Sequence, residues 1–193
     1  KLNDSNKKII IGYLGEIDKH DGLSIFVNAI DFLTKEKNEH NILCSIIGDG
    51  PELLNIKHLV EQLKLNTYFI FHGRLWGDDL SQKLNEFDIG VVPDSDNEFN
   101  QLSTMGKIFE YMSYSLPMVQ FDLKENRRIS TDSALFAKPD DIYDFGDKLY
   151  LLINNSTLRK KLGSHAFHKI RHDFCWEKQE KNLLNAYQRV INI

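Results

Sequence analysis

The sequence has few cysteines, no long apolar run and no excess of basic residues, and each of these absences excludes a class of protein. Two cysteines among 193 residues, Cys44 and Cys175, provide neither a disulfide framework nor zinc-ligand spacing, so we expect a reducing, cytoplasmic environment. The longest apolar runs fall far short of the roughly 18 residues that span a bilayer. Lys and Arg number 24 against 28 Asp and Glu, so we expect no nucleic-acid partner.

Several motifs of common enzyme classes are also absent. No Gly-x-Gly-x-x-Gly follows the first apolar run, which disfavours a nicotinamide-dependent enzyme. The sequence has no P-loop and no Gly-x-Ser-x-Gly elbow, which disfavours an NTPase and an α/β-hydrolase. His165, His168 and His172 lie at helical spacing, but no His-Glu-x-x-His motif accompanies them, and Lys169 and Arg171 lie beside them. We therefore predict no metal site.

Two apolar patterns alternate along the chain. Short, continuously apolar runs, typical of parallel strands covered on both faces, alternate with segments of about 10 to 15 residues at helical spacing. They indicate one α/β domain over residues 1–193: a Rossmann-like, doubly wound parallel sheet of about six strands with helices on both faces and C-terminal helices. The predicted strands are 7–13, 41–48, 67–72, 88–92, 117–121 and 134–137. The predicted helices are 22–35, 51–63, a short one capped by Asp78 or Asp79, 103–114, 140–154, 156–173 and 176–191, with 94–102 irregular.

In a sheet of this kind, ligands bind outside the carboxyl ends of the strands. The loops that follow the predicted strands there are 14–22, 48–51, 72–78, 93–103 and 122–129. They are rich in Gly, Asp, Lys, Arg and Asn, which suits a polar ligand.

The helix predicted from Ser103 has two distinct faces. Met105, Ile108, Phe109 and Met112 recur at i, i+3, i+4 and i+7 and should face the sheet. The other face carries groups that fit a nucleotide: Ser103 or Thr104 as a cap that leaves free N–H groups, Gly106 for close approach, Lys107 for phosphate and Glu110 for sugar hydroxyls. An exposed amphipathic helix with a solvated Lys-Glu face remains an alternative.

The order of the motifs resembles a known family. Gly12-Tyr13-Leu14-Gly15, Ile46-Ile47-Gly48-Asp49-Gly50-Pro51, Phe71-His72-Gly73-Arg74-Leu75, Ser103-Thr104-Met105-Gly106-Lys107-Ile108-Phe109-Glu110-Tyr111-Met112 and Leu116-Pro117-Met118-Val119 follow one another in that order. This series resembles the donor-binding C-terminal domain of glycosyltransferase family 4, and bacterial surface-polysaccharide members most of all. The likeness runs from about Gly12 to the last predicted helix.

The resemblance implies one half of a GT-B fold: a retaining transferase that binds a nucleotide-sugar, UDP-linked, and needs no metal. It implies that an N-terminal acceptor domain is absent from this chain and that the domain alone is inactive. It further implies that Glu110 holds the ribose and that the diphosphate is held by Ser103, Thr104, Gly106 and Lys107. The base would lie near Gly73 and Arg74, and the sugar near Gly15, Lys19 and His20.

The sequence departs from the family pattern at two sets of positions. Leu102 stands eight residues before Glu110, where the family has a first glutamate, so Asn100, Ser103 and Thr104 are expected to contact the sugar instead. Glu16 and Asp21 stand where a basic pair is usual. Either the basic, catalytic role then falls to Lys19, Arg74 or Lys107, or it is lost.

Two other functions are left open: a non-catalytic α/β module that binds a protein partner, and half of a nucleotide-sugar epimerase. Lys124, Arg127 and Arg128 form a basic cluster after the fifth predicted strand. It leaves open a contact with the diphosphate, with a partner domain or with acidic lipid at the inner face of the membrane, or simply a solvated loop. Trp176, at the start of the last predicted helix, is interpreted as a packing anchor.

Overall fold

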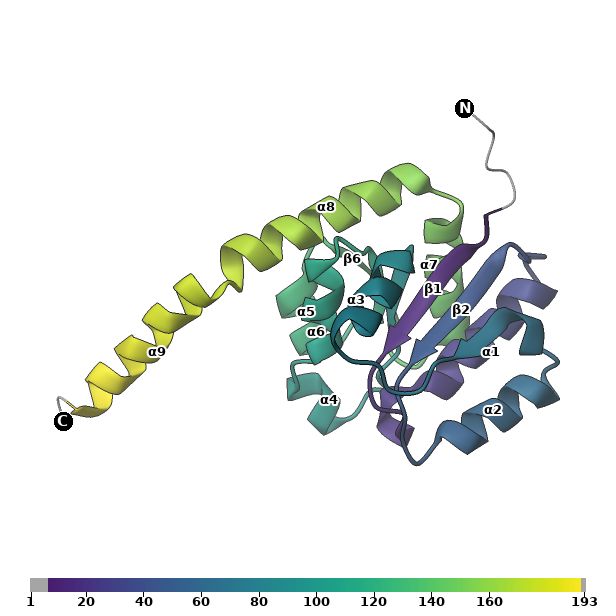
Figure 1. Cartoon of the computed structure of the whole chain (residues 1–193), viewed down its shortest axis with the longest axis horizontal. Coiled ribbons are helices and arrows are strands. Elements are labelled where there is room, and N and C mark those ends of the chain that lie inside the picture. Colours follow the sequence, from purple (N-terminus) through teal and green to yellow (C-terminus); the bar gives the residue numbers. More distant parts are fainter. Residues whose placement is uncertain (1–6, 192–193) are drawn as a thin grey trace.

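The computed structural model describes residues 7–191; residues 1–6 and 192–193 lie outside the described part. Six parallel strands form one sheet in the order β3-β2-β1-β4-β5-β6 (Figure 1). The predicted fold class is confirmed. The strands are β1 (Ile9–Leu14), β2 (Ile42–Ile47), β3 (Phe69–Phe71), β4 (Ile89–Val92), β5 (Met118–Phe121) and β6 (Ala134–Ala137).

Helices cover both faces of the sheet because the strands carry apolar side chains on both sides. One core cluster joins the sheet to α1 (Leu23–Lys35), α2 (Leu53–Gln62) and α7 (Ile142–Ile153). A second cluster on the opposite face joins it to α3 (Gly77–Glu86) and α5 (Gly106–Ser113). The strands therefore end between two packed layers, and their carboxyl ends meet at one edge of the molecule.

The closing helices match their predicted positions. The helices α8 (Ser156–Asp173) and α9 (Trp176–Ile191) have the predicted boundaries, and α7 ends one residue before the predicted end. Ala166 of α8 is fully buried against α5, whereas α9 extends away from the body (Figure 1).

The start of α5 differs from the prediction. The helix begins at Gly106, and Met105 at its N-cap has no capping side-chain hydrogen bond within the described residues. The predicted cap at Ser103 or Thr104 is therefore wrong. Ser103 has extended backbone, and the Thr104 hydroxyl donates a hydrogen bond of 2.7 Å to Glu125 instead. The predicted cap of α3 is also wrong, because Trp76 occupies its N-cap position.

Two short helices occupy segments predicted to be loops. Segment 94–102 contains α4 (Glu98–Leu102), which Asn97 caps through the backbone N–H of Asn100. The segment after β5 contains α6 (Lys124–Ser130). Two single 3-10 turns complete the described elements: η1 (Lys19–Asp21) and η2 (Asn66–Tyr68). η2 replaces the start of the predicted third strand.

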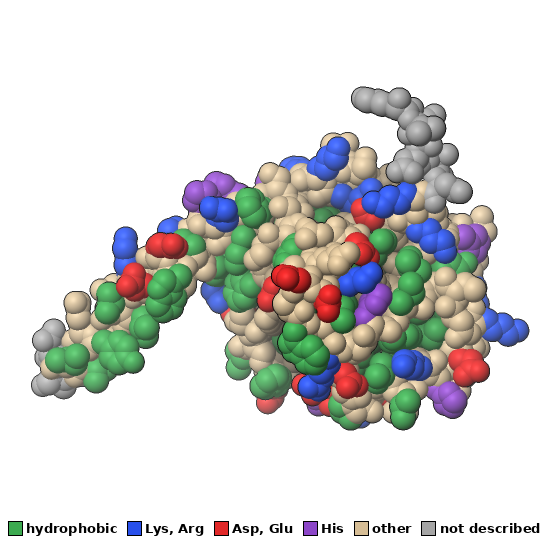
Figure 2. All heavy atoms as spheres, in the orientation of Figure 1, with side chains coloured by type: hydrophobic (Ala, Val, Ile, Leu, Met, Phe, Trp, Pro, Cys, Tyr) green, Lys and Arg blue, Asp and Glu red, His purple; other side chains and the backbone are tan. Residues whose placement is uncertain are grey.

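The last helix contributes little to the packing of the body. No described residue of α9 is buried, and 64% of Trp176 is accessible to solvent. The interpretation of Trp176 as a packing anchor is therefore wrong. Figure 2 shows hydrophobic side chains gathered along this projecting arm. None of the helices between residues 7 and 191 has both the length and the apolar character needed to cross a bilayer.

Candidate functional site

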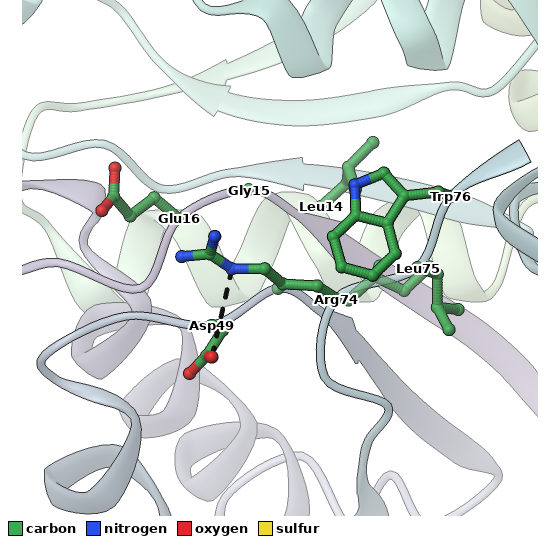
Figure 3. Close-up of a pocket in the computed structure, with 9 residues that line it drawn as sticks. Leu14, Gly15, Glu16, Asp49, Arg74, Leu75 and Trp76 are labelled. Carbon is green, nitrogen blue, oxygen red and sulfur yellow. Dashed lines mark ion pairs between the residues drawn. The ribbon is translucent and has the colours of Figure 1, made fainter.

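A cavity of about 400 Å³ lies at the carboxyl ends of β1, β2 and β3 (Figure 3). Three loops build it, and each follows a different strand. Its lining includes Leu14 at the end of β1 and Gly15 and Glu16 after it, Gly48 and Asp49 after β2, and Arg74, Leu75 and Trp76 after β3. The cavity thus lies where a ligand of a doubly wound sheet is expected.

Backbone contacts between glycines hold the three loops together. The Gly15 N–H donates to the Ile47 carbonyl at 3.0 Å, and the Gly48 N–H donates to the Gly73 carbonyl at 2.8 Å. A Cβ on Gly48 would lie 1.8 Å from the Gly15 carbonyl oxygen, and the φ of Gly48 is +146°. No other residue fits there. The glycines of these motifs therefore let the loops approach closely enough to form one wall.

Arg74 crosses the mouth of the cavity. Its Nε lies 4.0 Å from the Asp49 carboxylate, and both side chains are more than half exposed. Figure 3 shows its guanidinium between Asp49 and Glu16, with the Trp76 indole on the opposite side of the opening. An exposed pair of this kind binds weakly, so Arg74 is able to exchange Asp49 for an anionic ligand.

Beside this cavity, strands β1 and β4 separate around a tyrosine. The chain order of the sheet reverses between these strands, which pair only at Ile11–Ile89 and Gly12–Gly90. Beyond that point, the Leu14 N–H donates to the Tyr111 hydroxyl at 2.8 Å. Burial raises the pKa of Tyr111, so its hydroxyl remains neutral. The loop that contains Gly15 leaves β1 at this point, where β1 is no longer paired with β4.

Lys107 lies where β1 and β4 separate, between the loops that follow these two strands. Its Nζ lies 2.9 Å from Asp94 Oδ1 and 3.3 Å from Asp21 Oδ1, and only 6% of its side chain is exposed. The ammonium also lies 4.8 Å from the centre of the Tyr13 ring. Burial raises the pKa of Asp94, and the charge of Lys107 partly opposes that rise. Lys107, predicted to bind phosphate, is thus paired inside the protein.

The exposed face of α5 carries Gly106 and Glu110. Glu110 is exposed, and a Cβ on Gly106 would meet no described atom within 4 Å. Thr104 lies on the same side but is bound to Glu125, whose pKa Arg128 and then Thr104 lower to about 2. Ser103 is half-buried. The polar face predicted for this helix is therefore open at Gly106 and Glu110 and occupied at Lys107.

The segment after β1 is joined to the segment after β4. The His20 carbonyl accepts hydrogen bonds from the Ser95 N–H at 3.1 Å and from Asn100 Nδ2 at 3.0 Å. Asn100 is 2% exposed and also donates to the Ser95 carbonyl. Its amide nitrogen thus binds the two loops to each other. The side chains of Lys19 and His20 are exposed.

The predicted site residues fall into two neighbouring groups. Gly15 and Arg74 line the cavity, and the Gly73 carbonyl holds its wall. The others lie on α5 or on the loops before and beside it. Sequence reasoning missed Trp76, Asp94 and Tyr111. The available signal was their place in the predicted loops 72–78 and 93–103, each of which follows a predicted strand.

The remaining candidate groups form ordinary surface pairs. His165 lies 3.2 Å from Asp132, and the described residues contain no cluster of three or more His, Cys, Asp or Glu side chains suited to a metal. In the basic cluster after β5, Arg127 pairs with Asp122 and Arg128 pairs with Glu125.

Comparisons with known proteins agree with this fold. The family model described as "Glycosyl transferases group 1" matches residues 8–155. The chain is 28% identical over 171 residues to the sulfoquinovosyl transferase SQD2 of Arabidopsis thaliana, covering 85% of this chain and 30% of the plant protein. Overall it spans between 30% and 55% of the length of the curated relatives it matches.

Two solved structures have the same fold. Anabaena Alr3699/HepE, crystallised in complex with UDP, superposes with a TM-score of 0.82 at 13% identity, over 95% of this chain and 49% of that one. The C-terminal domain of a glycosyl transferase group 1 family protein (LpcC) from Francisella tularensis superposes with a TM-score of 0.72 at 22% identity. That match covers 87% of both chains.

Proposed function

This chain belongs to the glycosyl transferases of group 1, and on that premise we propose that it is the C-terminal, donor-binding domain of a GT-B enzyme of glycosyltransferase family 4. Two findings support the proposal. The chain spans about half or less of several relatives, and it shares its fold with an isolated C-terminal domain over most of both chains. The acceptor site would then lie in another half of the enzyme, and this domain alone would be inactive.

The proposed donor is a UDP-sugar. The observation that carries this proposal is an open cavity at the carboxyl ends of the strands, beside a helix that exposes a glycine and a carboxylate one turn apart. A carboxylate accepts hydrogen bonds from a pair of ribose hydroxyls, and the bare Gly106 leaves room for the groups attached to that ribose. The UDP complex of HepE, a protein of the same fold, also supports this choice.

In the proposed reaction, the bond between the sugar C1 and the diphosphate oxygen breaks, and C1 bonds to the oxygen of an acceptor hydroxyl, whose proton passes to the departing diphosphate. The configuration at C1 is retained, and the product belongs to a surface polysaccharide. Negative charge develops on the leaving diphosphate, and a positioned cation stabilises it. Arg74 at the cavity mouth and the exposed Lys19 are the proposed cations. No metal ion is required.

Titration of the chain with UDP, monitored by calorimetry and by NMR, tests the proposal. We expect weak, saturable binding that EDTA does not change. Glu110→Ala removes the hydrogen bonds of a charged group and should weaken binding about 10- to 100-fold. Glu61→Ala, an exposed glutamate on α2, is the matched control and should bind UDP as the wild type does.

Other outcomes would favour the alternatives. Absence of binding to UDP, GDP and ADP at millimolar concentration would favour a protein-interaction module. If Glu110→Ala leaves UDP binding unchanged, α5 is not part of the donor site. Product analysis with a complete enzyme distinguishes transfer from epimerisation.

A further inference from the structure

The buried charges under the candidate site form one connected group. Lys107 of α5 reaches Asp21, at the end of η1 after β1, and Asp94, in the loop after β4. Both distances allow a hydrogen bond from the ammonium. A single side chain of α5 thus contacts both loops that leave the sheet where its strand order reverses.

The two loops are already in close contact, and Lys107 provides the charge between them. A Cβ on Gly22 would lie 1.8 Å from the Pro93 carbonyl oxygen. The Asp21 carboxylate also accepts from the Asp18 N–H at 3.1 Å, so Lys107 and the η1 turn share that carboxylate. Loss of the ammonium would therefore release both loops together.

The charges in this group do not balance. One ammonium faces two carboxylates, and 1% of the Asp94 side chain is exposed. The Oδ2 atom of Asp94 is buried and lacks a hydrogen-bond partner among residues 7–191. Removing one partner of a buried ion pair leaves a charge that neither water nor protein stabilises. Asp94 therefore depends on Lys107, and the loop that carries Asp94 depends on both.

Lys107 also lies directly behind the wall of the cavity. A Cβ on Gly15 would lie 3.2 Å from Lys107 Cε, and Gly15 lines the cavity. The Tyr13 hydroxyl, which donates to the Glu16 carbonyl, lies at the same distance from that position. The lysine side chain thus packs behind the loop from Gly15 to Glu16 and supports it.

We propose that Lys107 is a positioning residue of the donor site: bound to Asp94 and Asp21, it fixes the loops that follow β1 and β4 and supports Gly15 without touching the donor. This inference rests on the proposed function for its ligand. It differs from a role as phosphate ligand, in which Lys107 would leave its carboxylates for the diphosphate. Because Lys107 is paired with two carboxylates, Arg74 and Lys19 remain as the cations that contact the donor.

A double-mutant cycle between Lys107 and Asp94 separates the two roles. Lys107→Met should weaken UDP binding at least tenfold, because Asp94 is left buried without its counter-charge. Asp94→Asn should weaken binding by a few fold. The double variant removes both charges together and should bind UDP better than Lys107→Met alone.

A direct phosphate contact gives a different pattern. Asp94→Asn would then free the ammonium and leave UDP binding unchanged or tighter, while Lys107→Met and the double variant would be equally weak. That result would overturn the proposal. The double variant also serves if Lys107→Met fails to fold, since it leaves no uncompensated carboxylate at Asp94.

Amide hydrogen exchange without nucleotide gives a second readout that does not depend on the ligand. In Lys107→Met, exchange at residues 16–22 and 94–97 should rise at least tenfold, and in the double variant it should rise less. Unchanged exchange in Lys107→Met would overturn the proposal. If the wild type binds none of UDP, GDP and ADP, the proposed function fails, and the exchange measurement still decides the positioning role.

The matched control is Lys35→Met, which removes a lysine paired with Asp31 one turn away on α1. The Lys35 side chain is 57% exposed, so its pair contributes little. We expect neither UDP binding nor exchange in the two loops to change. Equal effects of Lys35→Met and Lys107→Met would show that loss of any lysine suffices, which contradicts a specific role.

Discussion

At the scale of single residues, Gly106 differs from the other glycines of the site. Gly22 and Gly48 have positive φ angles, and a Cβ on either would meet a backbone oxygen at 1.8 Å. Gly106 has no such restriction, since its position is open among the described residues. Alanine is also the better helix former. The bare position is therefore best explained by a group that approaches from outside the described chain.

Replacing Gly106 by alanine should separate stability from binding. We expect Gly106→Ala to melt at the wild-type temperature or slightly above it, with a gain of less than about 1 kcal/mol, because the first helical turn gains a better residue. UDP binding should weaken several-fold, since the methyl group enters the proposed approach path. Calorimetric melting and UDP titration of the same sample measure both effects.

The control for this substitution is Gly48→Ala. We expect its melting temperature to fall well below that of the wild type, because the added Cβ collides with the Gly15 carbonyl. Wild-type UDP affinity in Gly106→Ala would contradict a donor path over the start of α5.

At the scale of elements, Tyr111 links α5 to the strands at the point where the sheet opens. The hydroxyl accepts from the Leu14 N–H and lies 3.3 Å from the carbonyl oxygens of Gly12 and Val91, so it can donate to either. It thereby replaces the ladder hydrogen bond that β1 no longer receives from β4. The helix that carries Glu110 is thus fixed to the strand that leads into the Gly15 loop.

Tyr111→Phe keeps the ring and removes only this link. The Leu14 N–H then loses its partner at a half-buried position, and a hydrogen bond of this kind contributes about 0.5–1.5 kcal/mol. We expect the free energy of unfolding in urea to fall by that amount. Tyr143→Phe is the control, because Tyr143 is 66% exposed and its loss should change stability by less than about 0.5 kcal/mol. Equal stability of the two variants would show that another group satisfies Leu14.

The long elements could be predicted from the sequence because their apolar pattern alone determines them. The strands are apolar apart from Ser45 in β2 and Gln120 in β5, and α8 and α9 begin and end at the predicted residues. The short helices α4 and α6 could not be predicted, since neither has enough residues to show a periodic apolar face. The start of α5 was misplaced because Thr104 binds Glu125, a partner distant in sequence.

The site could be predicted in position but only partly in its contacts. The glycine-rich loops come together at the strand ends, as the parallel order requires. The pairing of Lys107 with Asp94 joins residues 13 apart on different elements, and no local pattern reveals it. A helix diagram places Lys107 on the polar face of α5, whereas in the structure its side chain is 6% exposed, between the loops that carry Asp21 and Asp94.

At the scale of the whole molecule, the chain divides into a packed body and a projecting arm. The arm is α9, whose Leu183, Leu184 and Tyr187 are 46%, 53% and 59% exposed. These side chains lie on one face of the helix. A large apolar face of this kind is normally covered by a partner surface. Under the proposed function, the other half of the enzyme is the surface that we expect to cover it.

Because α9 packs against so little of the body, its apolar face should be dispensable for the stability of the domain. We expect Leu183→Asn combined with Leu184→Asn to leave the melting temperature within about 2 °C of the wild type, since no core contact is lost. Sedimentation should show less self-association, because the exposed apolar area falls. Leu149→Asn on α7 is the control: its side chain is fully buried, so a polar replacement should prevent cooperative folding. A large fall in melting temperature for the α9 variant would contradict the division into body and arm and would place the helix against the body in solution.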